Sequence, residues 1–250
     1  SRVCPQGDGD FNDEGIAFYD RFINDLIARG IEPMICLYHF DMPLALAQEY
    51  NGFNDRRVME AFIRYGKKMI DCYGDRVKYW LTFNEQNIFH MPEAFRISGY
   101  MHGEKTLREL YELQHHTMVA HMALTEYLHQ TRPGQLMGGM LAHQLIYPAT
   151  CKPRDIFCAQ QYDEFLNQNL LRVFAGQGYS PAVMAVVEQE GFGDIYRAED
   201  LALLERTRND YMAFSYYASK TLDSDAIPEG TPVNYYLLHG EKNNPYLKAT

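Results

Sequence analysis

The feature that most constrains the fold is a regular alternation of amphipathic helical stripes with short apolar runs. The stripes carry apolar residues three and four positions apart, whereas the short runs are mainly apolar without that spacing, as buried strands are. Four such runs occur, at 34–38, 77–83, 136–146 and 211–218. The first is continuously apolar, which predicts a strand buried on both faces, and the second is rich in β-branched and aromatic residues. Strands that alternate with helices form right-handed βαβ units, so the sequence predicts an α/β fold with a parallel sheet.

Helices are expected between these runs. The stripes predict helices over 14–29, 58–73, 106–130 and 155–174, and shorter ones over 183–189 and 199–206. The third begins with Thr106-x-x-Glu109, the pattern of a capping box. The last segment, 223–250, is polar and contains three prolines, so we expect a loop with at most a short strand there.

The length of the repeating unit favours a barrel. Each unit takes roughly 45 to 75 residues, which fits a (β/α)8 TIM barrel with extended loops. Four strands cannot close such a barrel, so we expect a single partial barrel domain over 1–250 that holds about four to five of the eight βα units. A flavodoxin-like open sheet is the alternative, but no glycine-rich phosphate loop follows the first predicted strand.

Charge and composition exclude several classes of function. Acidic residues outnumber basic ones 33 to 23, and the formal net charge of −10 argues against binding to nucleic acid or to an anionic membrane surface. The longest apolar run, 182–187, is far too short to span a bilayer. Five cysteines without a C-x-x-C pair disfavour a disulfide framework or zinc ribbon, which predicts a cytoplasmic protein. The abrupt start, without methionine or a signal-peptide core, suggests that the chain begins inside a longer one.

Polar side chains follow each predicted strand where it ends. They are His39-Phe40-Asp41, Asn84-Glu85, His143-Gln144 and Ser215-Tyr216-Tyr217. The carboxyl ends of parallel strands meet at one rim, which is where barrel enzymes bind their substrates. Carboxylates and amides bind sugar hydroxyls and aromatic rings cover apolar sugar faces, so this set predicts a sugar-binding site.

Glu85 is the sharpest candidate among these residues. It follows an apolar strand directly, and an apolar environment favours the protonated carboxyl that a general acid needs. Asn84 beside it can orient a substrate. The alternative is an ordinary glutamate at a helix N-terminus, where the helix dipole stabilises its charge.

Several segments resemble glycoside hydrolase family 1, which includes β-glucosidases and 6-phospho-β-glucosidases. Trp80-Leu81-Thr82-Phe83-Asn84-Glu85 resembles its acid/base signature. Segments 1–8, 30–43 and 214–217 are similar, in order, to the end of its second strand, its third strand and its sixth-strand motif. The Pro-Gln-Gly-Asp at 5–8, the Tyr-Pro and Cys-Lys-Pro within 147–153, and Ser215 in place of asparagine resemble the bacterial phospho-enzymes more closely.

The resemblance implies retaining hydrolysis by two carboxylates about 5 to 5.5 Å apart. It implies that Glu85 is the acid and later the base, that Asn84 binds the sugar 2-hydroxyl and His39 another hydroxyl, and that Tyr217 holds the nucleophile. The family's nucleophile lies in a Glu-Asn-Gly motif, which is absent from these 250 residues. The nucleophile is therefore expected outside this chain.

The resemblance thus predicts an enzyme that acts on a small phosphorylated β-glucoside and needs no cofactor. Two alternatives stay open. One is an ordinary β-glucosidase, and the other is an inactive truncated half-barrel that persists by pairing with itself, as a homo-oligomer, or with another chain.

The remaining candidates have structural interpretations. The helix predicted over 106–130 carries four histidines without a zinc-binding spacing, so we expect packed or solvated side chains and no metal site. Trp80, Met118 and Met122 are expected in the core. Ser215 lacks the G-x-S-x-G context of a serine hydrolase.

Overall fold

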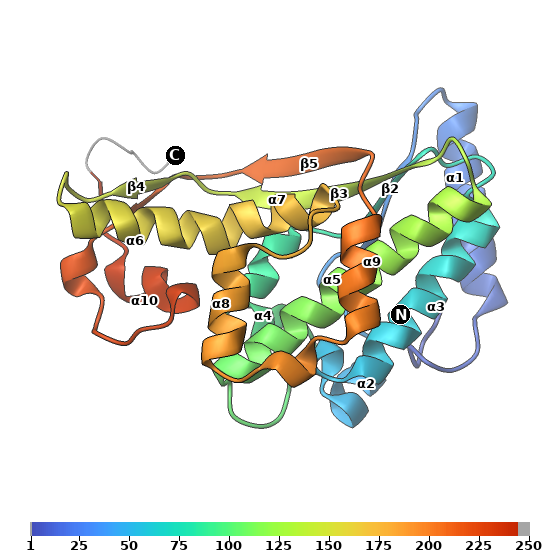
Figure 1. Ribbon diagram of the computed structural model, residues 1–250. Helices are drawn as coiled ribbons and strands as arrows, with labels where there is room; N and C mark the ends of the chain where they lie inside the picture. Colours follow the sequence, from blue (N-terminus) through green and yellow to red (C-terminus); the bar gives the residue numbers. More distant parts are fainter. Residues whose placement is uncertain (1, 245–250) are drawn as a thin grey trace.

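A four-stranded parallel sheet runs along one side of the molecule, the upper side in Figure 1, and most of the helices lie below it. The computed structural model describes residues 2–244. The strands are β1 (Met34–Tyr38), β2 (Tyr79–Phe83), β3 (Leu136–His143) and β5 (Tyr211–Tyr216), and they lie in the order β1-β2-β3-β5. All three pairings are parallel, as the alternation of strands and helices predicts, and the arrangement is part of a TIM barrel.

Two predicted strands are interrupted at the rim. The run 136–146 stops pairing after His143, and the run 211–218 stops after Tyr216. Just beyond these points the two segments pair again in a second parallel sheet of β4 (Ile146–Pro148) and β6 (Lys220–Leu222). Two residues separate His143 from Ile146, whereas three separate their partners Tyr216 and Lys220. The extra residue prevents continuous pairing, as in a β-bulge, and the side chain of Asn167 bonds the Gln144 carbonyl instead.

Helices form in all the predicted regions, but the structure also has helices outside them, at 44–50, 94–97 and 236–240. The helices are α1 (Asp13–Ala28), α2 (Leu44–Tyr50), α3 (Arg56–Tyr73), α4 (Ala94–Ile97), α5 (Leu107–Thr131), α6 (Pro153–Asp163), α7 (Asn169–Phe174), α8 (Pro181–Gln189), α9 (Ala198–Arg206) and α10 (Tyr236–Gly240). The helix predicted over 155–174 is divided by a π-helical turn at 164–168. The prediction of a loop after residue 223 was wrong for α10, which packs on a small core beside β6. None of the helices in the described part of the chain is long and apolar enough to cross a membrane.

The third predicted helix begins where expected, but its predicted capping box is not formed. Thr106 is the N-cap of α5, yet its side chain caps no backbone N–H. Its hydroxyl donates a hydrogen bond to the Glu109 carboxylate instead. The first turn of α5 therefore lacks the reciprocal bonds to the backbone that define the motif.

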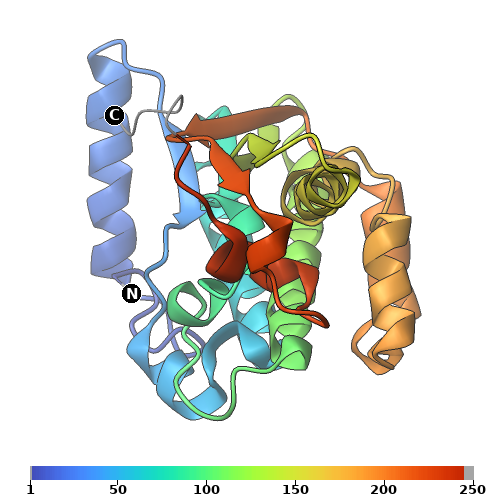
Figure 2. The ribbon, with the colours of Figure 1, turned by 90° about the vertical axis from the view of Figure 1, so that its left-hand side faces the viewer.

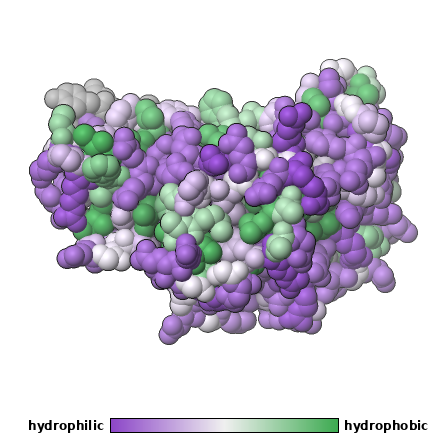
Figure 3. Space-filling view, in the orientation of Figure 1, coloured by the Kyte–Doolittle hydropathy of each residue, from purple (hydrophilic) through white to green (hydrophobic). Residues whose placement is uncertain are grey.

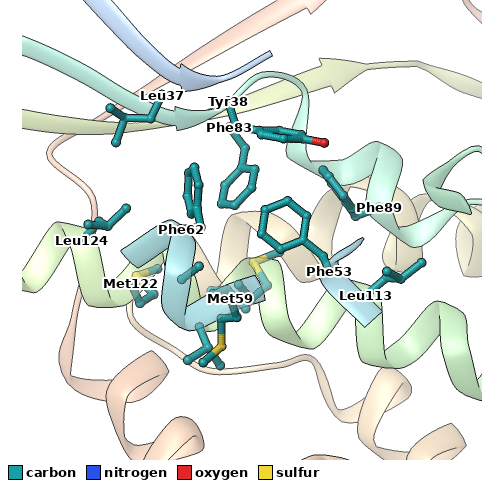
Figure 4. Packing of buried hydrophobic residues seen from close by; sticks show 14 of the residues in the cluster. Leu37, Tyr38, Phe53, Met59, Phe62, Phe83, Phe89, Leu113, Met122 and Leu124 are labelled. Carbon is teal, nitrogen blue, oxygen red and sulfur yellow. The ribbon is translucent and has the colours of Figure 1, made fainter. Parts of the chain in front are cut away.

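The main core lies between the sheet and the helices α3 and α5. Near the ends of β1 and β2, Tyr38 and Phe83 meet Phe53, Phe62 and Phe89 (Figure 4). The ring centroids of Phe62 and Phe83 are 4.7 Å apart, and several of the other pairs are edge-to-face, an arrangement that aromatic quadrupoles favour. Elsewhere in the core Trp80, Met118 and Met122 are fully buried, which confirms their predicted place.

The two outer strands of the sheet are much more exposed than the inner ones. Met34 of β1 is 54% exposed and Phe214 of β5 is 62% exposed. The prediction that 34–38 is buried on both faces was wrong, because β1 pairs only with β2 in the described chain. Figure 2 shows α1 standing apart from the rest of the molecule beside β1. A groove of about 650 Å³ is lined by residues of both elements, and α1 buries only Gly15 and Ile23. By contrast, the face with α6, α8 and α9 is mainly hydrophilic (Figure 3).

A buried ion pair joins three helices on that side of the molecule. Asp200 of α9, which is 3% exposed, accepts two hydrogen bonds from Arg56 of α3, at 2.7 and 2.8 Å. His115 of α5 lies 3.4 Å from the same carboxylate and 3.0 Å from the Tyr179 hydroxyl. Burial opposes ionisation of Asp200, but the hydrogen bonds from Arg56 and His115 prevail and hold its pKa well below the usual range.

Asp200→Asn should therefore lower the free energy of unfolding by about 3 kcal/mol, because it leaves the Arg56 guanidinium without its charged partner. Urea denaturation at neutral pH measures the change. Asp194→Asn is the matched control, since Asp194 pairs with Arg108 on the surface and its loss should have a much smaller effect. Equal losses in the two variants would show that the buried pair does not hold α9 to α3.

Candidate active site

The carboxyl ends of the four sheet strands lie at one rim, as the sequence predicts. β1 and β2 are direct neighbours, and the Asn84 N–H donates to the Tyr38 carbonyl over 2.9 Å. His39, which follows Tyr38, is thus adjacent to the Asn84-Glu85 segment. The structure brings these three predicted site residues together.

Glu85 combines an unusual backbone with a buried carboxyl group. Its φ of 45° and ψ of 55° lie in the left-handed region, which non-glycine residues seldom occupy. The residue is only 7% exposed, and its Oε1 is buried without a hydrogen-bond partner in the described protein. A strained backbone and an unpaired buried polar atom both cost free energy, and such features concentrate at functional sites.

The turn after β1 is strained in the same way. Phe40 has a φ of 68°, and the His39 N–H donates to the Asp41 carboxylate over 3.2 Å. The His39 side chain is exposed, whereas Asn84 is 7% exposed. The rim therefore carries an exposed imidazole at the end of β1 and a buried amide and a buried carboxyl at the end of β2. Together these groups can donate hydrogen bonds to a polyol and accept them from it.

Tyr217 lies on the same rim but farther along it. It follows β5 in the interrupted stretch before β6 and is 73% exposed. β3 stands between β2 and β5, so about 10 Å separates the two strands. No hydrogen bond in the described structure joins Tyr217 to Glu85, Asn84 or His39. Its predicted contact with a nucleophile stays a prediction.

Sequence reasoning stopped at Glu85 and missed the two residues that follow it. Gln86 is fully buried, and its Nε2 donates to the Thr117 carbonyl of α5 over 3.1 Å. Asn87 is 1% exposed and makes two hydrogen bonds to Ala142 of β3. Two amides directly after a candidate catalytic glutamate are a signal in the sequence, but their partners lie 31 and 55 residues away.

Of the four histidines of α5, His115, His116 and His121 are buried, whereas His129 is partly exposed and lies 2.8 Å from the Asp210 carboxylate. Packed and partly solvated side chains are both consistent with the prediction. His121 is fully buried between the Thr82 hydroxyl, 2.5 Å from its Nδ1, and Asn209, 2.8 Å from its Nε2. Burial lowers the pKa of His121 to about 4, although the bond to Asn209 opposes the shift, so the ring is neutral at neutral pH. Across residues 2–244, no cluster of three or more His, Cys, Asp or Glu side chains could hold a metal ion.

These features define a class: half of a parallel α/β barrel whose rim carries a buried, unpaired carboxyl beside hydrogen-bonding side chains. The glycosyl hydrolase family 1 model matches residues 1–248. The chain therefore belongs to glycosyl hydrolase family 1, which confirms the resemblance of its motifs.

Comparisons with individual proteins agree. The chain is 36% identical over 253 residues to the 6-phospho-beta-glucosidase AscB of Escherichia coli, with 100% of this chain and 52% of that protein covered. It is 35% identical over 256 residues to the aryl-phospho-beta-D-glucosidase BglH of Bacillus subtilis, with 100% and 53% covered. A family 1 β-glucosidase from Thermotoga maritima has the same fold, with a TM-score of 0.79 at 23% identity over 98% of this chain and 52% of that one. The chain spans about half the length of these relatives.

Glu85→Asn should raise the free energy of unfolding by about 1 kcal/mol, because asparagine tolerates the left-handed backbone better than glutamate does and the buried carboxyl is removed. Thermal and urea denaturation measure the change. Glu190→Asn is the control, at an exposed position with φ of −83°, and should leave stability nearly unchanged. A destabilised Glu85→Asn protein would mean that the strain at this position is not a cost to the fold.

Proposed function

We propose that the intact polypeptide containing these residues is a retaining glycosidase that hydrolyses 6-phospho-β-glucosides, with Glu85 as its proton donor. The observation that carries the proposal is the buried Glu85 carboxyl, unpaired at the barrel rim of a family 1 chain. The phosphorylated substrate is supported by the relatives named above, AscB and BglH, which are phospho-glucosidases. Because the chain covers about half of each, the activity is proposed for the whole protein.

In the first step a carboxylate attacks the anomeric carbon while Glu85 donates its proton to the departing glycosidic oxygen. The C–O bond breaks, and the sugar is held as a glycosyl ester. In the second step the Glu85 carboxylate takes a proton from water, whose oxygen attacks the anomeric carbon and releases the nucleophile. Both steps therefore move a proton at the Glu85 carboxyl, first to the leaving oxygen and then from water.

The other rim residues bind and orient the sugar in this proposal. Asn84 binds the 2-hydroxyl, His39 binds another hydroxyl, and Tyr217 donates a hydrogen bond to the nucleophile. The nucleophile comes from outside residues 1–250, because no Glu-Asn-Gly motif occurs within them. Two carboxylates carry the whole reaction, so the proposal includes no cofactor. We also propose that the protein is cytoplasmic, because its five cysteines include no C-x-x-C pair and do not indicate a disulfide framework.

Glu85→Gln in the intact protein should slow hydrolysis of an alkyl β-glucoside 6-phosphate by about 10² to 10⁴, because the amide cannot protonate the leaving oxygen. A dinitrophenyl leaving group needs no proton, so its release should be far less affected. The kcat/KM values on both substrates measure the contrast, because this ratio reports the first step and not the hydrolysis of the glycosyl ester, which also needs Glu85. Glu93→Gln is the control, because Glu93 is an exposed glutamate that follows Glu85 closely in the sequence. It should leave both rates nearly unchanged.

The remaining alternatives are separated when the same assay is repeated with the corresponding unphosphorylated glucoside. Preference for the unphosphorylated glucoside would make the protein an ordinary β-glucosidase. Residues 1–250 alone should hydrolyse neither substrate, because they lack the nucleophile. Intact-mass measurement of the natural protein shows whether it continues beyond these residues, and a natural protein of this length without activity would support the truncated half-barrel.

A further inference from the structure

The turn that carries Glu85 is held from three directions. The Asn84 N–H bonds β1, the Gln86 side chain bonds α5, and the Asn87 side chain bonds β3. Within the turn, the Ile88 N–H donates to the Glu85 carbonyl over 3.0 Å. A left-handed glutamate persists only where its surroundings fix the backbone on both sides, and these bonds do so.

Asn87 makes the most specific of these contacts. Its Nδ2 donates to the Ala142 carbonyl over 2.8 Å, and its Oδ1 accepts from the Ala142 N–H over 2.7 Å. The pairing of β2 with β3 ends at Leu81 and Gly138, whereas β3 stays paired with β5 as far as His143. The Asn87 amide therefore takes the place that a peptide group of β2 would occupy, beyond the end of the β2–β3 ladder.

This contact links the position of Glu85 to the far side of the rim. Ala142 is also the β3 partner of Ser215, two residues before Tyr217. Without the Asn87 amide, the Ala142 N–H and C=O would lose their partner in a buried place, and the turn would be free to move away from β3. The position of the Glu85 carboxyl would then no longer be fixed relative to β3.

We propose that Asn87 is a positioning residue: its side-chain amide joins the Glu85 turn to β3 and so aims the Glu85 carboxyl at the leaving oxygen. This inference rests on the proposed function. It makes a chemical prediction that a purely structural role does not. Misplacing the proton donor slows the first step only for substrates whose leaving group needs a proton, whereas the second step, in which Glu85 acts as the base, is the same for every substrate.

The test compares Asn87→Ala with the unaltered intact protein on methyl and 2,4-dinitrophenyl β-glucoside 6-phosphates. The loss in kcat/KM, which reports the first step, should be at least tenfold greater for the methyl substrate than for the dinitrophenyl substrate. Asn169→Ala is the matched control, since Asn169 is fully buried and accepts from the Ser180 N–H over 2.8 Å between α7 and α8. It should affect both substrates equally.

Asn87→Asp gives a second measurement if the alanine variant does not fold. A protonated aspartic acid can donate to the Ala142 carbonyl and accept from its N–H, as asparagine does, whereas the carboxylate can only accept. The ratio of Asn87→Asp activity to unaltered activity on the methyl substrate should therefore rise as the pH falls, and the ratio on the dinitrophenyl substrate should change much less.

Equal losses on the two substrates, or no loss, would overturn the role of Asn87 while leaving the proposed function intact. An unaltered protein that cleaves neither substrate would overturn the proposed function, and the role of Asn87 in the reaction with it. The two failures are thus told apart by the unaltered protein alone.

Discussion

The pairing of β2 between β1 and β3 is the interaction on which the rest of the structure depends. β2 is hydrogen-bonded on both sides, and four of its five residues are buried. β1 and β3 fix the position of β2 from its two sides, and the aromatic cluster around Phe83 packs against the sheet near the end of β2. Because Glu85 lies only two residues after this strand, the sheet fixes the point from which the Glu85 turn starts.

Much of this arrangement could be predicted from the chain alone. The apolar runs and helical stripes predict the parallel sheet, and the buried Trp80 and Met118 fit the periodicity. The strand ends predict that His39 and Glu85 share a rim, because parallel strands end at the same edge. The exposure of Met34 could not be predicted, since burial depends on which strands stand next to it and not on the residue itself.

The details of the site were less accessible for a related reason. The backbone conformation of Glu85 is held by bonds to segments that are distant in sequence, and no local pattern encodes a left-handed glutamate. Asn87 and Ala142 are 55 residues apart, so only the folded sheet shows that the amide replaces a peptide group. The same holds for the one-residue difference in length between the β3–β4 link and the β5–β6 link, which leaves Tyr217 outside any strand.

The open edges of the sheet connect stability with the proposed chemistry. In a closed barrel every strand has a neighbour on each side, whereas β1 and β5 have one each within the described chain. The exposed side chains of Met34 and Phe214 lie on these two strands, and relatives of this chain are about twice as long. Under the proposed function, the strands that complete the barrel also supply the nucleophile. Closure of the barrel would then bury these apolar edges and also place the nucleophilic carboxylate beside Glu85. The two catalytic carboxyl groups would therefore come together only when the sheet is closed.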